Sequence, residues 1–285
     1  MCVFCCFRDG ICANFGEGHV PAMPAPPLTN PPPPLTAFAV THAGHVRDQN
    51  EDAFGSFPDD RLFVVADGMG GHNAGEIAAQ IAVDEVSAFF RSFHGDPRQQ
   101  WPYPVDRDRS LGANLLTVGM RVANQKIRDA AAAERSRTKM ACTAVALAVG
   151  DNQVSVVHAG DARAYRLRGG RIKRLTRDHS ILEEMLAARP DMTDAEVAAF
   201  SHRNVVTKAL GSKPDVDPTL YVGRFQKDDL FLLCSDGLWG SVKDHVIAEV
   251  LHPMTDLEAA CHLLVDAAND AGGPDNITVL LARVG

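Results

Sequence analysis

The sequence predicts an α+β fold in which helices cover antiparallel sheets. Strand-like apolar runs follow one another closely between residues 143 and 176, and the hairpin signals Gly150-Asp151-Asn152 and Gly169-Gly170 separate them. Amphipathic helical stretches stand before and after these runs, for example at residues 74–93. Consecutive hairpins produce antiparallel pairs, and a helix with one apolar face needs a sheet face to cover.

The first 35 residues are expected to form a disordered Cys/Pro-rich tail, and residues 36–285 a single domain. The segment at residues 21–34 reads PAMPAPPLTNPPPP. Proline removes backbone donors and fixes φ, so this composition favours an extended chain without regular structure. Four of the seven cysteines lie upstream of it, within the first 12 residues, with no spacing typical of a disulfide framework.

The domain is expected to alternate short strands with helices. Its predicted strands lie at residues 37–44, 61–67, 143–150, 153–160, 162–170, 171–176, 229–237 and 276–284, and Ala53-Phe54 is strand-like as well. Its predicted helices lie at residues 74–93, 111–133, 179–188, 193–200, 242–251 and 256–270. In the first helix, Ile77, Ile81 and Val86 recur at helical spacing on or near one face.

Composition excludes some classes of function. The net charge is −8, which argues against nonspecific nucleic-acid binding because that needs a basic surface. No apolar stretch reaches the ~18 residues of a membrane span, and no secretory signal is evident. Cys142, Cys234 and Cys261 stand singly in apolar surroundings. A reduced, cytoplasmic protein is therefore expected.

Acidic residues mark the ends of several predicted strands. One apolar run ends in Asp67-Gly68 and another in Asp236-Gly237. A single Asp-Gly is a common turn, whereas two at the ends of buried strands are more informative, since Gly permits a sharp turn or an exposed carbonyl beside the acid. Six acids fall at such boundaries: Glu51, Asp52, Asp67, Asp161, Asp236 and Asp275.

Six carboxylates gathered at one rim would repel one another, and several would be forced to protonate. Divalent cations remove that repulsion, and all-oxygen ligands select Mg²⁺ or Mn²⁺. Zn²⁺ is disfavoured because no His or Cys pair stands beside these acids with a ligand-like spacing. Two ions about 3.5–4 Å apart can activate a bridging water for in-line displacement at phosphorus.

Seven segments, in order over residues 37–284, resemble the PPM family, the metal-dependent protein phosphatases of type 2C. They are Gly44–Arg47 with Asn50–Ala53, VVADGMGGHNAGEIAA (64–79), HAGDARAYRLRGG (158–170), LTRDHS (175–180), NVVTKALG (204–211), LFLLCSDGLW (230–239) and GGPDNITVLL (272–281). Any one segment would be a weak signal, whereas the ordered set is specific. The wording DGMGGH is closer to bacterial members than to animal ones.

The resemblance implies a four-layer α-β-β-α sandwich of two antiparallel sheets flanked by helix pairs, with metals at one end. It implies that Asp67 bridges two Mn²⁺ or Mg²⁺ ions. The remaining roles follow the family pattern: Glu51 and the Gly68 carbonyl at one ion, Asp236 and Asp275 at the other, Asp52 orienting water, Asp161 with Asp236 at a third, weaker site, and Arg47 on the substrate phosphate. A guanidinium suits the last role because it binds phosphate bidentately.

The implied activity is hydrolysis of phosphoserine and phosphothreonine in proteins, opposing a serine/threonine kinase. The stretch at residues 181–203 matches the family's flap, over the mouth of the site; we call it the flap segment. Met69 stands where animal members carry His, so no general acid follows Asp67-Gly68, and metal-bound water or a group outside the motif is expected to protonate the leaving oxygen. His72 is expected to be structural.

Two other classes remain to be weighed. Cys2 and Arg8 have the Cys-x₅-Arg spacing of cysteine-based phosphatases, but the intervening residues contain no Gly and no strand or helix flanks them. Coincidence within the tail is the better interpretation. A pseudophosphatase that binds phosphopeptides without catalysis is the second class. Such proteins usually lack one or more metal carboxylates, and this sequence retains all of those in the family pattern.

Overall fold

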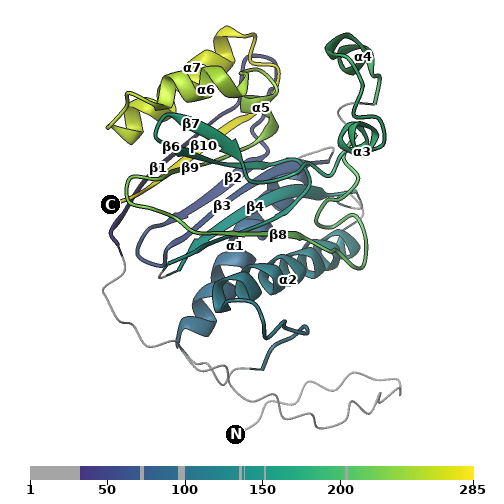
Figure 1. Ribbon diagram of the computed structural model, residues 1–285. Coiled ribbons are helices and arrows are strands. Elements are labelled where there is room, and N and C mark those ends of the chain that lie inside the picture. Colours follow the sequence, from purple (N-terminus) through teal and green to yellow (C-terminus); the bar gives the residue numbers. More distant parts are fainter. Residues whose placement is uncertain are drawn as a thin grey trace, which may run out of the picture.

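The computed structural model describes residues 33–70, 74–95, 100–134, 137, 139–150, 152–202 and 205–285. Two five-stranded antiparallel sheets face each other, and helices cover their outer faces (Figure 1). The α+β sandwich expected from the sequence is therefore confirmed. The expected tail lies almost entirely outside the described residues.

Each sheet is built from strands distant in sequence. The first runs in the order β1 (Leu35–His42), β10 (Ile277–Val284), β9 (Leu230–Cys234), β6 (Arg163–Arg168) and β7 (Arg171–Arg174). The second runs in the order β2 (Asp52–Phe57), β3 (Leu62–Met69), β4 (Ala141–Val149), β5 (Val154–Ala159) and β8 (Thr219–Gly223).

Two groups of helices form the outer layers, and a third pair stands apart. The second sheet is covered by α1 (Ala74–Gly95) and α2 (Leu111–Ala133), the first by α5 (Asp236–Trp239), α6 (Asp244–Leu251) and α7 (Leu257–Asp270) (Figure 1). The flap segment contains α3 (Ile181–Ala188) and α4 (Asp194–Ala199), which project beyond the sheets. No helix in the described ranges is long and apolar enough to cross a membrane.

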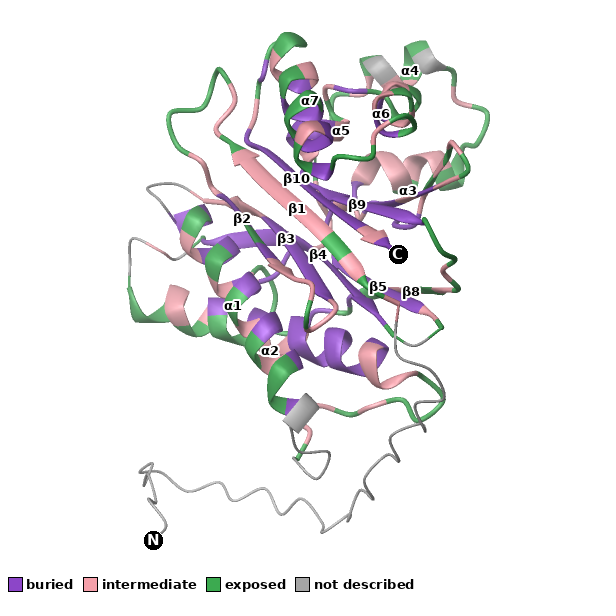
Figure 2. Ribbon diagram, turned by 90° about the vertical axis from the view of Figure 1, so that its left-hand side faces the viewer, coloured by how far each residue is buried: buried purple, intermediate pink, exposed green. Residues whose placement is uncertain are grey.

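Strand β4 shows how the sequence makes the layers. All nine of its residues are buried, because one face meets helices and the other meets the opposite sheet (Figure 2). Alanines such as Ala144 and Ala146 pack toward α1 and α2, whereas Val145 and Leu147 fill the space between the sheets. Small side chains let helices lie close to the sheet, and branched ones fill the wider gap between the two sheets.

The structure corrects the predicted elements at two places. Residues 229–237 were expected to form one strand, but β9 ends at Cys234 and α5 begins at Asp236. Strand β8 was not predicted. It pairs with β5 at the edge of the sheet, and its residues do not alternate between buried and exposed.

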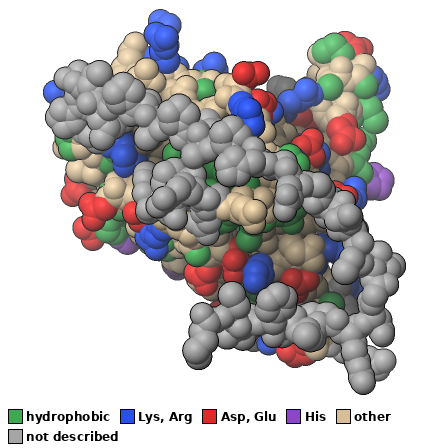
Figure 3. All heavy atoms as spheres, turned by 90° about the horizontal axis from the view of Figure 1, so that it is seen from below, with side chains coloured by type: hydrophobic (Ala, Val, Ile, Leu, Met, Phe, Trp, Pro, Cys, Tyr) green, Lys and Arg blue, Asp and Glu red, His purple; other side chains and the backbone are tan. Residues whose placement is uncertain are grey.

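Figure 3 shows the face of the molecule seen from below. Over the described residues, acidic and basic side chains are interspersed on this face.

Candidate active site

The strand boundaries that carry the acids meet at one rim of the sandwich. Asp52 and Asp67 are directly opposite each other across β2 and β3. Asp236 follows the end of β9, and Asp275 precedes the start of β10. These two strand ends are neighbours because β9 and β10 pair in antiparallel. Asp161 lies between β5 and β6, and Arg163 at the start of β6 pairs with Cys234 at the end of β9. The antiparallel registers therefore bring both sheets' acids to the same end.

These carboxyl groups perturb one another strongly. Burial first, then the charges of Asp236 and Asp52, raise the pKa of Asp67 well above its ordinary value. Burial and the charge of Asp275 raise the pKa of Asp236 to about 6, although a hydrogen bond with Asp67 opposes the shift. Burial and the charge of Asp236 raise the pKa of Asp161 to about 7. A compact acidic cluster of this kind favours a cation among its members.

Asp52 is held by two hydroxyl groups. Ser235 and Thr278 donate to its Oδ2 at 2.7 and 2.6 Å. Burial nevertheless raises the pKa of Asp52 to about 7, with the charges of Asp236 and Asp275 adding to the effect. Its Oδ1 is buried and has no hydrogen-bond partner among the described atoms, and the same holds for Oδ1 of Asp236. Buried carboxylate oxygens without partners are costly unless a cation or water satisfies them.

Gly68 and Gly75 allow three backbone segments to meet at Glu51. The Gly68 N–H donates to the Glu51 carbonyl at 3.1 Å, and a Cβ on Gly68 would lie 2.2 Å from the Gly75 carbonyl oxygen. Burial raises the pKa of Glu51, although a hydrogen bond from the Gly75 N–H, in the first turn of α1, to its carboxylate opposes the shift. A helix N-terminus stabilises a carboxylate in this position.

Arg47 lies on the loop before β2 and reaches across to the start of β10. Its Nη2 is 2.7 Å from Oδ2 of Asp275, and 54% of its side chain is exposed. Hydrogen bonding and the charge of Asp275 raise the pKa of Arg47. The structure therefore joins the expected phosphate-binding residue to an expected metal ligand.

Asn276 fixes this loop, and the sequence reasoning did not single it out. Its Oδ1 accepts from the Glu51 N–H at 2.8 Å, and its Nδ2 donates to the carbonyls of Ala43 and Gln49 at 3.0 and 2.8 Å. The sequence signal that could have identified it is an Asn between Asp275 and an apolar strand, because a buried amide at the start of a strand needs several hydrogen-bond partners.

The expected ligands converge on one rim without forming a finished coordination shell. Among the described residues, no three His, Cys, Asp or Glu side chains are arranged as they would be around a bound ion. Asp236 lies within hydrogen-bonding reach of Asp67, and Arg47 donates to Asp275. The oxygen-only donors and the unpartnered Oδ1 atoms of Asp52 and Asp236 nevertheless fit hard divalent cations. Met69 ends β3, and His72 lies outside the described residues.

Comparison with known proteins settles the family. The sequence model of the family described as protein phosphatase 2C matches residues 41–268. The chain belongs to the protein phosphatase 2C family. The match spans the rim acids from Glu51 to Asp236 and the flap segment; Asp275 lies just beyond it.

Protein phosphatase 2C relatives cover most of this chain. Serine/threonine phosphatase stp of Listeria monocytogenes is 31% identical over 250 residues, which is 85% of this chain and 93% of the relative. The structure of PppA, a regulatory component of the type VI secretion system in Pseudomonas aeruginosa, superposes with a TM-score of 0.72 at 34% identity, covering 88% of this chain and 98% of PppA.

A third relative bears on metals. The catalytic domain of serine/threonine protein phosphatase PstP, solved in complex with two manganese ions, superposes with a TM-score of 0.74 at 31% identity. The superposition covers 88% of this chain and 98% of that domain.

Proposed function

We propose that this chain hydrolyses phosphoserine and phosphothreonine in proteins at its acidic rim, with the help of two divalent cations. The supporting observation is the buried acidic cluster, in which mutual repulsion and burial raise carboxyl pKa values and two Oδ1 atoms lack partners. Membership of the protein phosphatase 2C family supports the substrate class. The manganese-bound PstP domain supports the number of ions.

Each rim residue receives a role in this proposal. Asp67 would contact both ions, Glu51 and the Gly68 carbonyl would hold one of them, and Asp236 and Asp275 would hold the other. Mn²⁺ or Mg²⁺ suits these oxygen donors, and such a pair supplies Lewis acidity and a nucleophilic water for attack at phosphorus. Asp161 with Asp236 would bind a third ion more weakly.

The chain's own groups bind and orient the reactants. Arg47, half exposed, would exchange its contact with Asp275 for the substrate phosphate, which it can grip with two N–H groups. Asp52, fixed through Oδ2 by Ser235 and Thr278, keeps Oδ1 available to orient the attacking water. Met69 has no proton to donate, so a group outside the Asp67-Gly68 motif has to protonate the leaving oxygen of serine or threonine.

The proposed partners are phosphorylated proteins, including a serine/threonine kinase that this enzyme opposes, in the cytoplasm. Free, buried Cys142, Cys234 and Cys261 support a reducing compartment. The non-catalytic alternative is disfavoured, since every acid of the family pattern is present and lies at the rim.

The deciding experiment is a phosphatase assay on phosphoserine, phosphothreonine and phosphotyrosine peptides after chelation, with and without added Mn²⁺ or Mg²⁺. Turnover of the first two that depends on the ion is expected. Full turnover in excess chelator would refute the proposal, and phosphopeptide binding without turnover at any ion concentration would establish the pseudophosphatase.

A further inference from the structure

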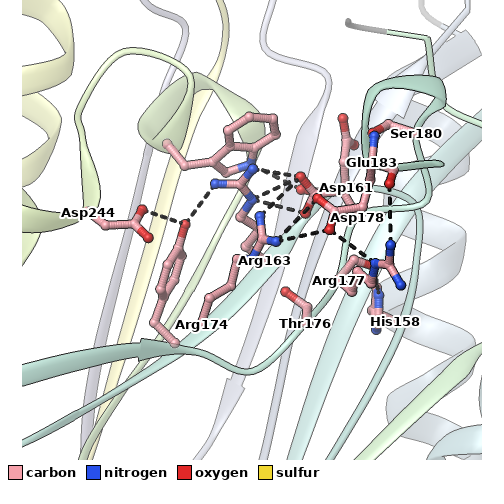
Figure 4. Close-up of polar contacts among 12 residues, drawn as sticks. His158, Asp161, Arg163, Arg174, Thr176, Arg177, Asp178, Ser180, Glu183 and Asp244 are labelled. Atoms are coloured by element: carbon pink, nitrogen blue, oxygen red, sulfur yellow. Dashed lines mark hydrogen bonds and ion pairs between the residues drawn. The ribbon is translucent and has the colours of Figure 1, made fainter. Parts of the chain in front are cut away.

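A buried arginine lies beside the rim and has no role in the function described so far. The Arg163 side chain is 12% exposed and that of Asp178 is 6% exposed. Arg163 donates through Nε to Oδ1 at 3.0 Å and through Nη2 to Oδ2 of Asp178 at 2.6 Å. Its Nη1 donates to the Tyr165 hydroxyl at 3.0 Å, and that hydroxyl donates to Asp244 (Figure 4). All three guanidinium nitrogens therefore donate a hydrogen bond.

The face of the guanidinium is engaged as well. Its Cζ lies 3.5 Å from the centroid of the Trp239 ring, and the Trp239 indole N–H donates to the Asp161 carbonyl at 3.0 Å. Trp239 ends the short helix α5 that begins at Asp236. Arg163 itself is two residues beyond Asp161. The guanidinium therefore stacks on α5, and Trp239 of α5 is bonded in turn to the Asp161 loop from which Arg163 extends.

Asp178 connects this cluster to the flap segment. It lies three residues before the start of α3. Beside it, His179 accepts from the Gly160 N–H at 3.0 Å through Nδ1 and donates its own N–H to the Gly160 carbonyl at 3.0 Å. Ser180 then caps α3 by accepting from the Glu183 N–H. The base of the flap segment is thus bonded directly to the loop that contains Asp161.

Polar contacts hold the first flap helix, because α3 buries no side chain. Glu183 accepts from Arg177 Nε at 3.0 Å and from Arg174 Nη2 at 3.2 Å, both upstream of the flap segment (Figure 4). Nη1 of Arg174 also lies 3.6 Å from Oδ2 of Asp178. A helix with so little apolar burial takes its position from such bonds.

Stability alone does not account for the buried pair. Burial would lower the pKa of Arg163, but its bonds to Asp178 and Tyr165 outweigh this and raise it, so the charge persists. Apolar residues of similar volume usually serve stability as well as a buried ion pair does. What an ion pair with two parallel hydrogen bonds adds is a fixed orientation, which a lysine cannot reproduce while also stacking on a ring.

We propose that Arg163 is a positioning residue that couples the flap segment to the Asp161–Asp236 side of the metal site. By binding Asp178 at its edge and Trp239 on its face, it keeps the flap base, the Asp161 loop and α5 in one arrangement. The proposal rests on the proposed function of that site. It implies that flap order and ion requirement change together when the guanidinium is replaced.

The test compares Arg163→Lys with a matched control, Arg168→Lys. Arg168 lies on the same strand and binds buried Asp229 in the same two-point manner, with Nε–Oδ1 2.6 Å and Nη2–Oδ2 2.5 Å, but at the far end of β6. Each full-length variant is measured for amide hydrogen exchange at residues 181–202, for the Mn²⁺ concentration that gives half-maximal activity, and for KM and kcat on a phosphopeptide.

In Arg163→Lys, exchange in the flap segment should accelerate about tenfold or more, because the charged bonds that fix its base are weakened. The Mn²⁺ requirement should rise and KM for the phosphopeptide should rise more than kcat falls. Arg168→Lys should change none of these, even where its melting temperature falls. Asp178→Asn keeps the side-chain shape and one acceptor oxygen, and it should shift the exchange rate and the Mn²⁺ requirement in the same direction. If Arg163→Lys does not fold, Asp178→Asn takes its place in the comparison.

A variant that melts lower but keeps wild-type flap exchange and Mn²⁺ requirement would overturn the proposal, since Arg163 would then be structural only. Equal flap loosening in Arg168→Lys would overturn it too. Failure of the proposed function has a separate signature: the wild type would show no ion-dependent turnover at all, while the exchange comparison would still decide whether Arg163 holds the flap segment.

Discussion

Gly68 gives the sharpest test of how the rim is assembled. It lies in β3 directly after Asp67, where its carbonyl is a proposed ion ligand. A Cβ at this position would lie 2.2 Å from the Gly75 carbonyl oxygen and 2.5 Å from the Glu51 carbonyl oxygen. Both are backbone atoms, so no side-chain rotation can relieve the contact. In Gly68→Ala, the start of α1 or the loop at Glu51 must move.

The expected magnitude follows from these contacts. Overpacking a tight site typically costs about 1–3 kcal/mol of the free energy of unfolding. For a domain of this size that corresponds to a fall in Tm of roughly 2–4 °C for each kcal/mol. Moving Glu51 away from the Gly75 N–H also disturbs a proposed ligand, for which displaced supporting contacts typically weaken metal affinity about 10–100-fold.

The assay is thermal unfolding together with a Mn²⁺ titration of phosphatase activity. Gly112→Ala is the control, because a Cβ on Gly112, in α2, would meet nothing nearer than the Ala148 Cβ at 3.7 Å. Replacing a helical Gly by Ala there should leave activity unchanged and raise stability by up to about 1 kcal/mol. A Gly68→Ala protein with wild-type Tm and wild-type Mn²⁺ dependence would refute the inference that close backbone packing positions this site.

Asp236→Ala should abolish ion-dependent turnover because it removes a charge from the proposed ion site; an active variant would exclude Asp236 as a ligand. Arg47→Ala should lower kcat/KM on phosphopeptides roughly 30–150-fold through loss of a charged bidentate contact, with the Mn²⁺ requirement unchanged; a collapse of metal affinity would instead assign Arg47 a structural role. Asp161→Ala should slow turnover while metal analysis still finds two ions bound; loss of both ions would contradict a separate third site. In chelator, Tm should fall as the pH rises from about 4 to about 7. Burial raises the pKa of Asp52 and Asp161 to about 7, so over this range the folded chain holds protons that the unfolded chain releases. Excess Mn²⁺ should reverse that slope, and a chelated protein that gains stability over the same range would contradict the clustering of these acids.

The sequence by itself determined the fold class and the chemistry of the rim. Short apolar runs bounded by turn signals, such as Leu62–Ala66, are typical of buried strands, and an acid followed by Gly at their ends limits where charge can lie. Composition and oxygen-only candidates then pointed to hard cations without knowledge of any distance. Local patterns sufficed for these conclusions because strand burial and turn chemistry depend on neighbouring residues.

The tertiary structure decided which groups meet. Pairing of Asp52 with Asp67, the two hydroxyls on Asp52 and the contact of Arg47 with Asp275 all join residues from separate strands, which no local pattern specifies. The helix at Asp236 and the unpredicted β8 have the same origin, since packing against distant segments overrides weak local preference. Arg163 shows the difference most clearly: the sequence presents a charged residue at a strand end, and only the packed chain surrounds it with Asp178, Tyr165 and Trp239.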